Sequence, residues 1–290
     1  MTAGLTPIDR GLPGATTAPR ERRHRSAPRW LRLVPAAVLV VLAVVGPMLV
    51  THDPTLIASA PGLAPNAQNW FGTDGNGYDV FSRVMAAFRV DVPIGALAAI
   101  IASAAGILCG IVTGMNESRR GVVGLAAQGL SRFLDLFQAV PAIVIGLIAS
   151  TLYGTSETAL ILIMAAVMFP LQAKLVRTET LKVKNEAYVD AARMAGFREL
   201  HLTIRNVLPN ASWPAFEYAP ILFGSALVLT AGLGFLGVGI KMPTPEWGTM
   251  LATGASDASA GRWWGFLFPG LALSLSIVAA SVLFSGRQKD

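Results

Sequence analysis

The chain has 290 residues, of which 53% are hydrophobic and 14% charged, whereas a soluble domain typically has about 25% charged residues. The apolar content excludes a disordered chain, and a single cysteine excludes a disulfide-stapled secreted domain. The net charge of +6 would suggest a nucleic-acid partner for a soluble protein. This composition instead indicates an all-α integral membrane protein with no nucleic-acid partner.

Residues 1–32 are basic and lack apolar periodicity, so we expect a solvated cytoplasmic tail. Its arginine cluster at 20–25 could contact anionic headgroups, although we favour an orientation signal. An apolar run at 33–50 follows, and as a helix it would rise about 27 Å through a hydrocarbon core of about 30 Å. Residues 58–60, Ala-Ser-Ala, allow a signal peptide, but the run exceeds the usual apolar region of about 7 to 15 residues. We expect an uncleaved first transmembrane helix, then an extracytoplasmic segment at 51–91.

Further apolar stretches predict five more membrane spans, six in all, at 92–115, 125–152, 159–172, 213–235 and 265–284. Basic residues are unevenly divided between the segments that join these spans. Eighteen of them lie in the N-terminal tail, the 116–120 loop, the 173–212 loop and the tail at 286–290, whereas the alternate loops hold four. Because lysine and arginine accumulate on the cytoplasmic side, both termini are predicted to be cytoplasmic.

Few ionisable residues fall within the predicted spans, which disfavours a proton-coupled or ion-coupled machine. Arg132 and Asp135 can pair on one helix face, so we interpret them as a structural ion pair rather than a proton relay. Glu217 lies near the start of the fifth span. The three histidines lie outside the spans and far apart, at His24, His52 and His201. No metal-ligand spacing occurs, and we predict no catalytic residue, metal site or cofactor in this chain.

Small residues recur at every fourth position of the second predicted span, at Ala98, Ala102, Gly106, Gly110 and Gly114. That spacing gives one helix face a groove in which another helix can pack closely. The partner is either a helix of this chain or a second subunit. Prolines at 141, 220 and 269 can bend the later spans, which would suit a gated pathway.

The 173–212 loop is far longer than the usual connection of about 2 to 8 residues between bundle helices. Residues 184–196 read as a helix with Ala187, Ala191 and Met194 on one face and Gly196 as its C-terminal cap. A second short helix is expected at 198–210, stopped by Pro209. Together they predict a knob, residues 184–210, suited to a groove on a partner protein. The alternative is an amphipathic hairpin on the membrane surface.

The knob carries a motif with defined spacing. Asp190-Ala191-Ala192 is followed after three residues by Gly196 and, nine residues later, by the segment 206–209, Asn-Val-Leu-Pro. This resembles the Glu-Ala-Ala, Gly, Ile-x-Leu-Pro loop of ABC importer permease subunits, with Asp for Glu and Asn for Ile. In that family the loop is the coupling helix that docks on the ATP-hydrolysing subunit. The resemblance implies an ATPase-coupling interface at Tyr188, Asp190, Ala191, Ala192, Arg193 and Gly196.

Two segments on the predicted outer side narrow the resemblance. Residues 70–84 resemble the FGTD-x-x-G-x-D-x-F-S-R segment of dipeptide, oligopeptide and nickel permeases. Residues 234–251 resemble their SFLGLG-x-x-P-P-TP-x-WG-x-ML segment, with Gly234 and Met242 as departures, and the motif order points to the C-type (dipeptide permease C-like) subunit. In that family this side receives substrate from a binding protein, which implies a contact region at Asp74, Asp79, Pro243, Pro245 and Trp247. Alternatively, these loops only cap the helices, with Trp247 as an interfacial anchor.

The resemblance implies an ABC importer type I permease bundle of six transmembrane helices, with its core at 92–285, in a bacterial plasma membrane. Expected partners are a second homologous permease, two ATPase subunits that bind ATP and Mg, an extracytoplasmic binding protein and membrane lipid. No G-x-x-x-x-G-K-[ST] loop occurs in the sequence, so the chain is not expected to be an enzyme. Dipeptides or oligopeptides are the expected cargo, with nickel chelates or haem as alternatives. A self-contained channel or ion-coupled carrier ranks lower, because midplane charges and matched broken helices are not evident.

Overall fold

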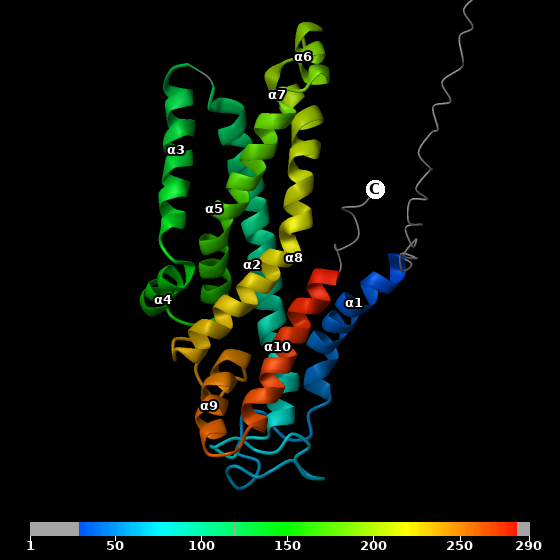
Figure 1. Cartoon of the computed structure of the whole chain (residues 1–290), viewed down its shortest axis with the longest axis vertical. Coiled ribbons are helices and arrows are strands. Elements are labelled where there is room, and N and C mark those ends of the chain that lie inside the picture. Colours follow the sequence, from blue (N-terminus) through cyan, green and yellow to red (C-terminus); the bar gives the residue numbers. More distant parts are fainter. Residues whose placement is uncertain (1–28, 119, 283–290) are drawn as a thin grey trace, which may run out of the picture.

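Long helices run broadly along the longest dimension of the molecule, and shorter elements close its two ends (Figure 1). The computed structural model describes residues 29–118 and 120–282. The expected tail at 286–290, and all but the last four residues of the expected tail at 1–32, lie outside the described residues. In chain order the elements are α1 (Arg29–Val45), a 3₁₀ turn η1 (Gly46–Met48), α2 (Val80–Asn116), α3 (Val122–Ala139), α4 (Ala142–Tyr153), α5 (Glu157–Val183), α6 (Ala187–Met194), α7 (Glu199–Leu202), a π-helical turn η2 (Thr203–Val207), α8 (Leu208–Phe235), α9 (Trp247–Ser259) and α10 (Trp264–Val282).

The two ends of the molecule are built differently. The short helices α6 and α7 cap one end, and α9 together with the 49–79 loop closes the other (Figure 1). In the part of the chain that the structure describes, extended pairing is limited to an isolated bridge between Thr73 and Asp79. The all-helical class predicted from the sequence is therefore confirmed.

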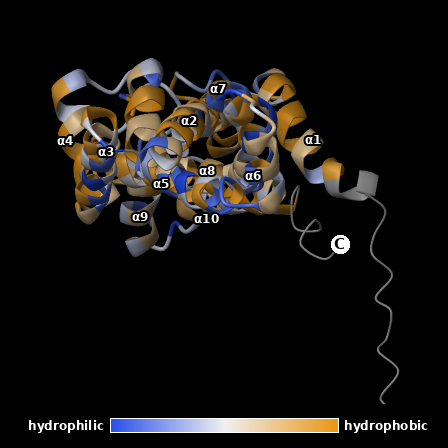
Figure 2. Cartoon of the chain, turned by 90° about the horizontal axis from the view of Figure 1, so that it is seen from above, coloured by the Kyte–Doolittle hydropathy of each residue, from blue (hydrophilic) through white to orange (hydrophobic). Residues whose placement is uncertain are grey.

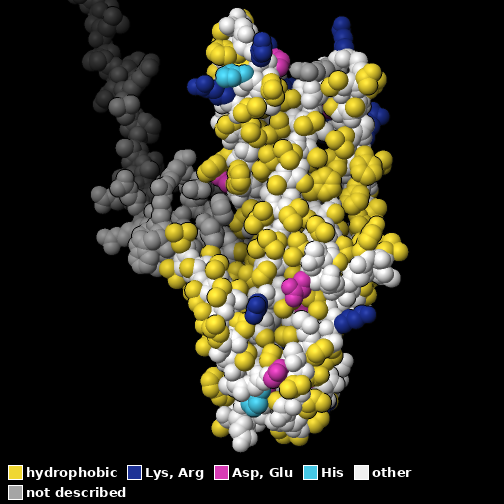
Figure 3. Space-filling model, turned by 180° about the vertical axis from the view of Figure 1, so that it is seen from behind, with side chains coloured by type: hydrophobic (Ala, Val, Ile, Leu, Met, Phe, Trp, Pro, Cys, Tyr) yellow, Lys and Arg dark blue, Asp and Glu magenta, His cyan; other side chains and the backbone are white. Residues whose placement is uncertain are grey.

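Within residues 29–118 and 120–282, four helical segments are long and apolar enough to cross a membrane: α2, α5, the α7 to α8 unit (Glu199–Phe235) and α10. The pair α3 and α4 makes a fifth candidate although it is bent by 92°, and Leu33–Met48 is a shorter apolar helix. Hydrophobic side chains cover the middle of the face in Figure 3, with charged side chains nearer the two ends. Hydrophilic residues gather at α6 and α7 (Figure 2). The α6 end therefore has the polarity of a segment that projects into water.

The span expected at 125–152 is not one continuous helix, because two helices meet there at a sharp bend. Helix α3 ends at Ala139, and Val140 takes an extended conformation with ψ of 130°. Pro141 then stands directly before α4. A proline ring clashes with a helical conformation of the preceding residue, and proline lacks the N–H that a continuing helix needs. The bend that the sequence placed at Pro141 is thus a complete break in the helix.

The stripe of small residues on α2 packs against α5, which identifies its partner as a helix of the same chain. A Cβ added to Gly106 would lie 2.6 Å from Gln172 Cβ, and one added to Gly110 would lie 2.6 Å from the carbonyl oxygen of Ala173. Farther along, a Cβ on Gly114 would lie 2.7 Å from Thr180 Cβ. Contacts below about 3 Å leave no room for a side chain, so the two helix backbones meet closely along this seam.

The 49–79 loop forms an ordered layer over the α9 end. Arg83, in the first turn of α2, is buried and donates from Nη1 to the carbonyl oxygens of Pro54, at 3.0 Å, and Pro243, at 3.1 Å. Phe71 of the loop stacks on Phe268 of α10 with 3.8 Å between ring centroids. These contacts fix the loop to three separate parts of the chain.

Candidate functional site

The knob is attached to the bundle by a few buried side chains and exposes the rest. Val189 of α6 is fully buried. The face formed by Ala187, Ala191 and Met194 is not the side that packs, because all three side chains are exposed and Met194 is 85% exposed. On a helix of eight residues that packs by one side chain, the sequence pattern has too few apolar positions to identify that contact.

Gly196 ends α6 in the left-handed conformation, with φ of +86°. The Gly196 amide donates to the Arg193 carbonyl at 3.1 Å and the Phe197 amide donates to the Ala192 carbonyl at 3.3 Å, which is the pattern of a Schellman cap. Nothing lies within 4 Å of a Cβ added to Gly196. Glycine is therefore favoured here by backbone conformation and not by close packing.

Arg193 joins the two short helices of the knob. Its guanidinium contacts Asp190 at 2.7 Å within α6 and Glu199 at 2.8 Å in α7. The hydroxyl of Tyr188 accepts from Asn210 Nδ2 at 3.0 Å, which links α6 to the start of α8. The residues implied as a coupling interface thus lie together on one exposed hairpin, and some of their polar groups hold that hairpin in shape.

The second short helix does not stop at Pro209, contrary to the sequence prediction. Helix α7 continues through η2 into α8, and Pro209 occupies the first turn of α8. Proline is tolerated in a first helical turn, where its missing N–H needs no partner within the helix. The π-helical turn ahead of it changes the hydrogen-bond spacing without ending the helix. The chain therefore passes from the knob directly into a membrane-length helix.

An apolar surface covers the outside of the knob, formed by Met194, Phe197, Leu200 and Ile204. Their side chains are between 51% and 85% exposed, and the Phe197 ring stacks on His201 with centroids 5.3 Å apart. Sequence reasoning missed this surface because the apolar residues are spread over two helices and a turn. Exposed apolar patches on a water-facing element commonly mark protein interaction sites.

Ion pairs tie the end of α5 beside the knob to its neighbours. Arg177 of α5 donates from Nε to Glu117 at 2.8 Å, and this hydrogen bond lowers the pKa of the Glu117 carboxyl. Lys184 Nζ donates to the carbonyl oxygen of Gly114 at 2.9 Å. The expected pairing of Asp135 with Arg132 is wrong, since Asp135 pairs with Lys174 of α5 at 2.9 Å. The sequence spacing allowed a pair within one helix, but the tertiary fold supplies an interhelical partner.

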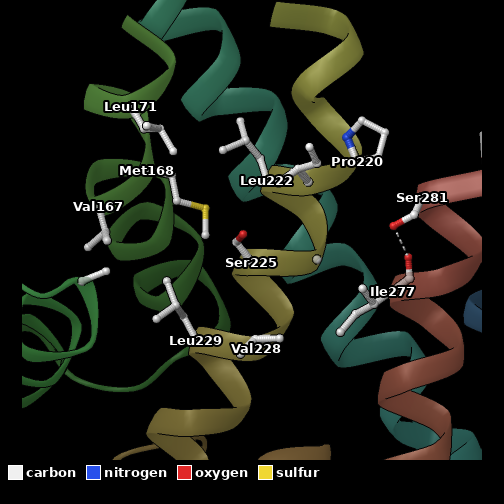
Figure 4. A pocket seen from close by; sticks show the side chains of 13 residues that line it. Val167, Met168, Leu171, Pro220, Leu222, Ser225, Val228, Leu229, Ile277 and Ser281 are labelled. Carbon is white, nitrogen blue, oxygen red and sulfur yellow. Dashed lines mark hydrogen bonds between the residues drawn. The ribbon is translucent and has the colours of Figure 1, made fainter. Parts of the chain in front are cut away.

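An open groove of about 600 Å³ lies between α5, α8 and α10 (Figure 4). Met168 of α5 and Ser225 of α8 point toward one another across it. Its lining is apolar apart from two serines and consists of Ala142, Val167, Met168, Leu171, Pro220, Ile221, Leu222, Gly224, Ser225, Val228, Leu229, Ile277 and Ser281. Pro220, one of the expected bend positions, is in the lining.

The aspartates predicted for the outer side shape the loop in which they lie. Asp74 accepts from the amides of Asn76 and Tyr78, both at 2.9 Å. Asp79 is buried and caps α2 by accepting from the Ser82 amide at 2.8 Å. Asp74 is partly exposed, so part of its side chain lies on the surface of the molecule.

Trp247 is not the interfacial anchor that the sequence suggested, because its side chain is fully buried. It packs edge-on against Phe88 of α2 with ring centroids 4.8 Å apart. Pro245 is also buried, whereas Pro243 is exposed. The neighbouring Glu246 is buried as well, and burial raises the pKa of its carboxyl to about 7. This segment therefore joins the core, and only Pro243 of the three predicted residues faces outward.

The family described as "Binding-protein-dependent transport system inner membrane component" matches residues 106–286. The chain belongs to this family. The match takes in the last part of α2, from residue 106, together with the knob, the groove and α9. The resemblance inferred from the sequence motifs is confirmed, and the chain is a permease subunit of an ABC-type transport system.

Two curated relatives match most of this chain and are named as peptide transport permeases. The protein of Escherichia coli K12 named a probable D,D-dipeptide transport system permease, DdpC, is 33% identical over 87% of this chain and 84% of the relative. The di/tripeptide transport system permease DppC of Pseudomonas aeruginosa is 32% identical over 86% of this chain and 82% of the relative. Binding-protein-dependent transport implies a substrate-binding protein and an ATPase as partners of this inner-membrane component.

Proposed function

We propose that this chain is one of two homologous permease subunits of an ATP-driven importer of dipeptides or oligopeptides. The cargo is inferred from the peptide transport systems named for its relatives. In this proposal six transmembrane segments cross the membrane, with α1 as the first and the bent α3 and α4 pair as the third. Both termini then lie in the cytoplasm, and the α9 end faces the binding protein.

The observation that carries the proposal is the exposed knob at the end of α5. Its apolar outer surface and its clustered charges, Asp190 and Arg193, suit a groove on an ATPase subunit. Two such subunits would bind ATP and Mg and close on one another. Because the knob runs into α8 through a continuous helix, a push on the knob would tilt a membrane-length helix.

The groove between α5, α8 and α10 supplies half of the translocation pathway in this proposal, and the second permease supplies the facing half. Because the groove lining is apolar and has few hydroxyl groups, it would not bind cargo tightly. Weak binding suits a translocation pathway, which must release its cargo. On the outer side Asp74 and Pro243 are candidates for direct contact with the binding protein. Asp79, Pro245 and Trp247 would support that surface from below.

The proposal is tested by expressing the tagged chain with its candidate permease, ATPase and binding-protein partners and purifying it in mild detergent. We expect a second permease and ATPase subunits to copurify. In proteoliposomes the complex should take up labelled dipeptides and oligopeptides when ATP and the binding protein are present. Uptake of nickel chelates or haem in place of peptides would contradict the proposed cargo, and solute movement by the chain alone without ATP would contradict the importer class.

The Asp190 carboxylate provides a focused test of the coupling interface. We expect Asp190→Ala to weaken retention of the ATPase subunits at least about tenfold, since truncating a charge that becomes buried at an interface costs about 2 kcal/mol or more. Loss of its exposed pair with Arg193 should cost the fold less than about 1 kcal/mol. Glu179→Ala is the matched control, because Glu179 also pairs with a basic residue three positions along its helix, Lys182, but lies on α5. Equal losses in both variants, or reduced membrane insertion of the Asp190 variant, would contradict the interface.

A further inference from the structure

The first turn of α9 is held by two carboxylates from different parts of the chain. Asp91 of α2 accepts from the Trp247 amide at 3.0 Å. Glu246 accepts from the Gly248 amide at 2.8 Å and from the Thr249 amide at 2.9 Å. The first amides of a helix have no partner within the helix. In α9 three of them are satisfied in this way, and one of the acceptors belongs to a membrane-length helix.

The other end of α9 is held to the segment that precedes α2. Asp257 accepts from the Gly75 amide at 2.6 Å and pairs with Arg262 at 2.9 Å. A Cβ on Gly75 would collide with the Asp257 carboxylate, so the loop and α9 are in close contact. Both ends of α9 are therefore connected to the outer part of α2 or to the residues that lead into it.

The Trp247 side chain extends the contact between the start of α9 and α2. Its ring packs on Phe88, and its indole N–H donates to the Val84 carbonyl at 3.4 Å. Val84, Phe88 and Asp91 are separated by four and three residues, so they lie on one face of α2. The start of α9 packs against this one face of α2.

Asp91 is in a position where a carboxylate is energetically unfavourable. It is 3% exposed and lies in α2, an apolar helix of 37 residues. A carboxylate buried in an apolar helix is unfavourable unless it has a hydrogen-bonding role, and a hydrophobic residue would fill the same space without that cost. The backbone amide of Trp247 gives it that role.

We infer that α9 is carried by α2, and that Asp91 is the positioning residue that transmits displacement of α2 to α9 during transport. This inference rests on the proposed function. The glycine seam joins α2 to α5, and α5 leads into the knob. Movement that begins at the knob thus reaches the outer end of the pathway through α5, α2 and Asp91.

The direct test measures the distance between α2 and α9 in two states of the assembled transporter. Spin labels are placed at Ala104 and Ser256, which are exposed in this chain, after Cys109 is replaced by Ala. Double electron–electron resonance is recorded without nucleotide and after vanadate trapping, with trapping verified by arrest of ATP hydrolysis. We expect the same distance in both states. In Asp91→Leu we expect a broader distribution that shifts on trapping.

Transport measurements then separate positioning from simple stabilisation. We expect Asp91→Leu to raise the ATP hydrolysed per peptide imported about fivefold or more, as the loss of a typical coupling free energy would. Asp91→Asn keeps an oxygen acceptor for the Trp247 amide and should restore most of the coupling. Asp53→Asn is the control, because Asp53 lies in the same outer layer and its carboxylate accepts from the amide and the hydroxyl of Thr55, within its own loop.

The possible results give distinct conclusions. A wild-type distance that shifts on trapping, or an Asp91→Leu distance that behaves as wild type, overturns the inference. Parallel losses of uptake, ATP hydrolysis and assembled complex would also overturn it, because they indicate a structural role alone. A wild-type complex that hydrolyses ATP but imports no peptide contradicts the proposed cargo, whereas the distance measurement still decides the role of Asp91.

Discussion

Gly110→Val should strongly lower the stability of the folded chain. The added Cβ would lie 2.6 Å from the Ala173 carbonyl and 2.7 Å from Val176 Cβ, and backbone atoms of α5 cannot move aside alone. Overpacking typically costs about 1–3 kcal/mol, and a collision with backbone along the main seam should cost at least about 3 kcal/mol. We expect a strongly reduced yield of monodisperse protein in detergent and a lower midpoint of thermal unfolding.

Gly129→Val is the matched control for that experiment. Gly129 lies within α3, also a glycine in an apolar helix, but nothing lies within 4 Å of a Cβ added there. We expect yield and thermal midpoint close to those of the unmodified chain. If Gly110→Val purified with an unchanged midpoint, the close packing of α2 on α5 would be contradicted.

Gly196→Val should abolish coupled uptake and leave the membrane helices in place. A β-branched residue in the left-handed region is strained by about 1–2 kcal/mol, so the cap of α6 should open and the hairpin should lose its shape. A Cβ added at Gly196 meets nothing within 4 Å, so we expect the bundle itself not to be disturbed. We expect normal membrane insertion, with ATP-driven peptide uptake reduced at least about tenfold, since 1.4 kcal/mol corresponds to a factor of ten.

Two further variants identify the cause of that loss. Gly196→Asn should retain most of the uptake, because asparagine adopts the left-handed conformation more readily than valine. Gly154→Val imposes the same backbone strain away from the knob, where φ is +87° and space is also open, and it should affect uptake much less. Wild-type uptake by Gly196→Val would contradict the role assigned to the knob.

Some of the candidate site could be predicted because its signals are local in the sequence. The knob was found from its length, its alanines and Gly196, and the structure gives Gly196 the positive φ that a C-terminal cap requires. The buried face of the knob could not be predicted, because the burial of Val189 depends on which parts of the folded chain lie beside it. The course of the chain past Pro209 likewise depends on a π-helical turn that has no clear sequence signature.

Contacts between distant segments account for most of what sequence reasoning missed. Asp135 pairs with a lysine on another helix, and Trp247 is buried by residues of α2. The acceptor for the Trp247 amide is Asp91, 156 positions away. In the sequence Asp91 stands only at the edge of an apolar run, and nothing near it indicates a partner.

The sequence by itself determined the membrane class, the stripe of small residues, a bend at Pro141 and the family. These could be predicted because hydropathy, helical period and motif spacing are properties of neighbouring residues. Only the tertiary structure decided that the stripe meets α5, that α3 and α4 are separate helices, and that α9 is attached to α2. The physical reason is that burial and hydrogen bonding depend on which surfaces meet in three dimensions, and a residue's neighbours in the chain do not specify its neighbours across the bundle.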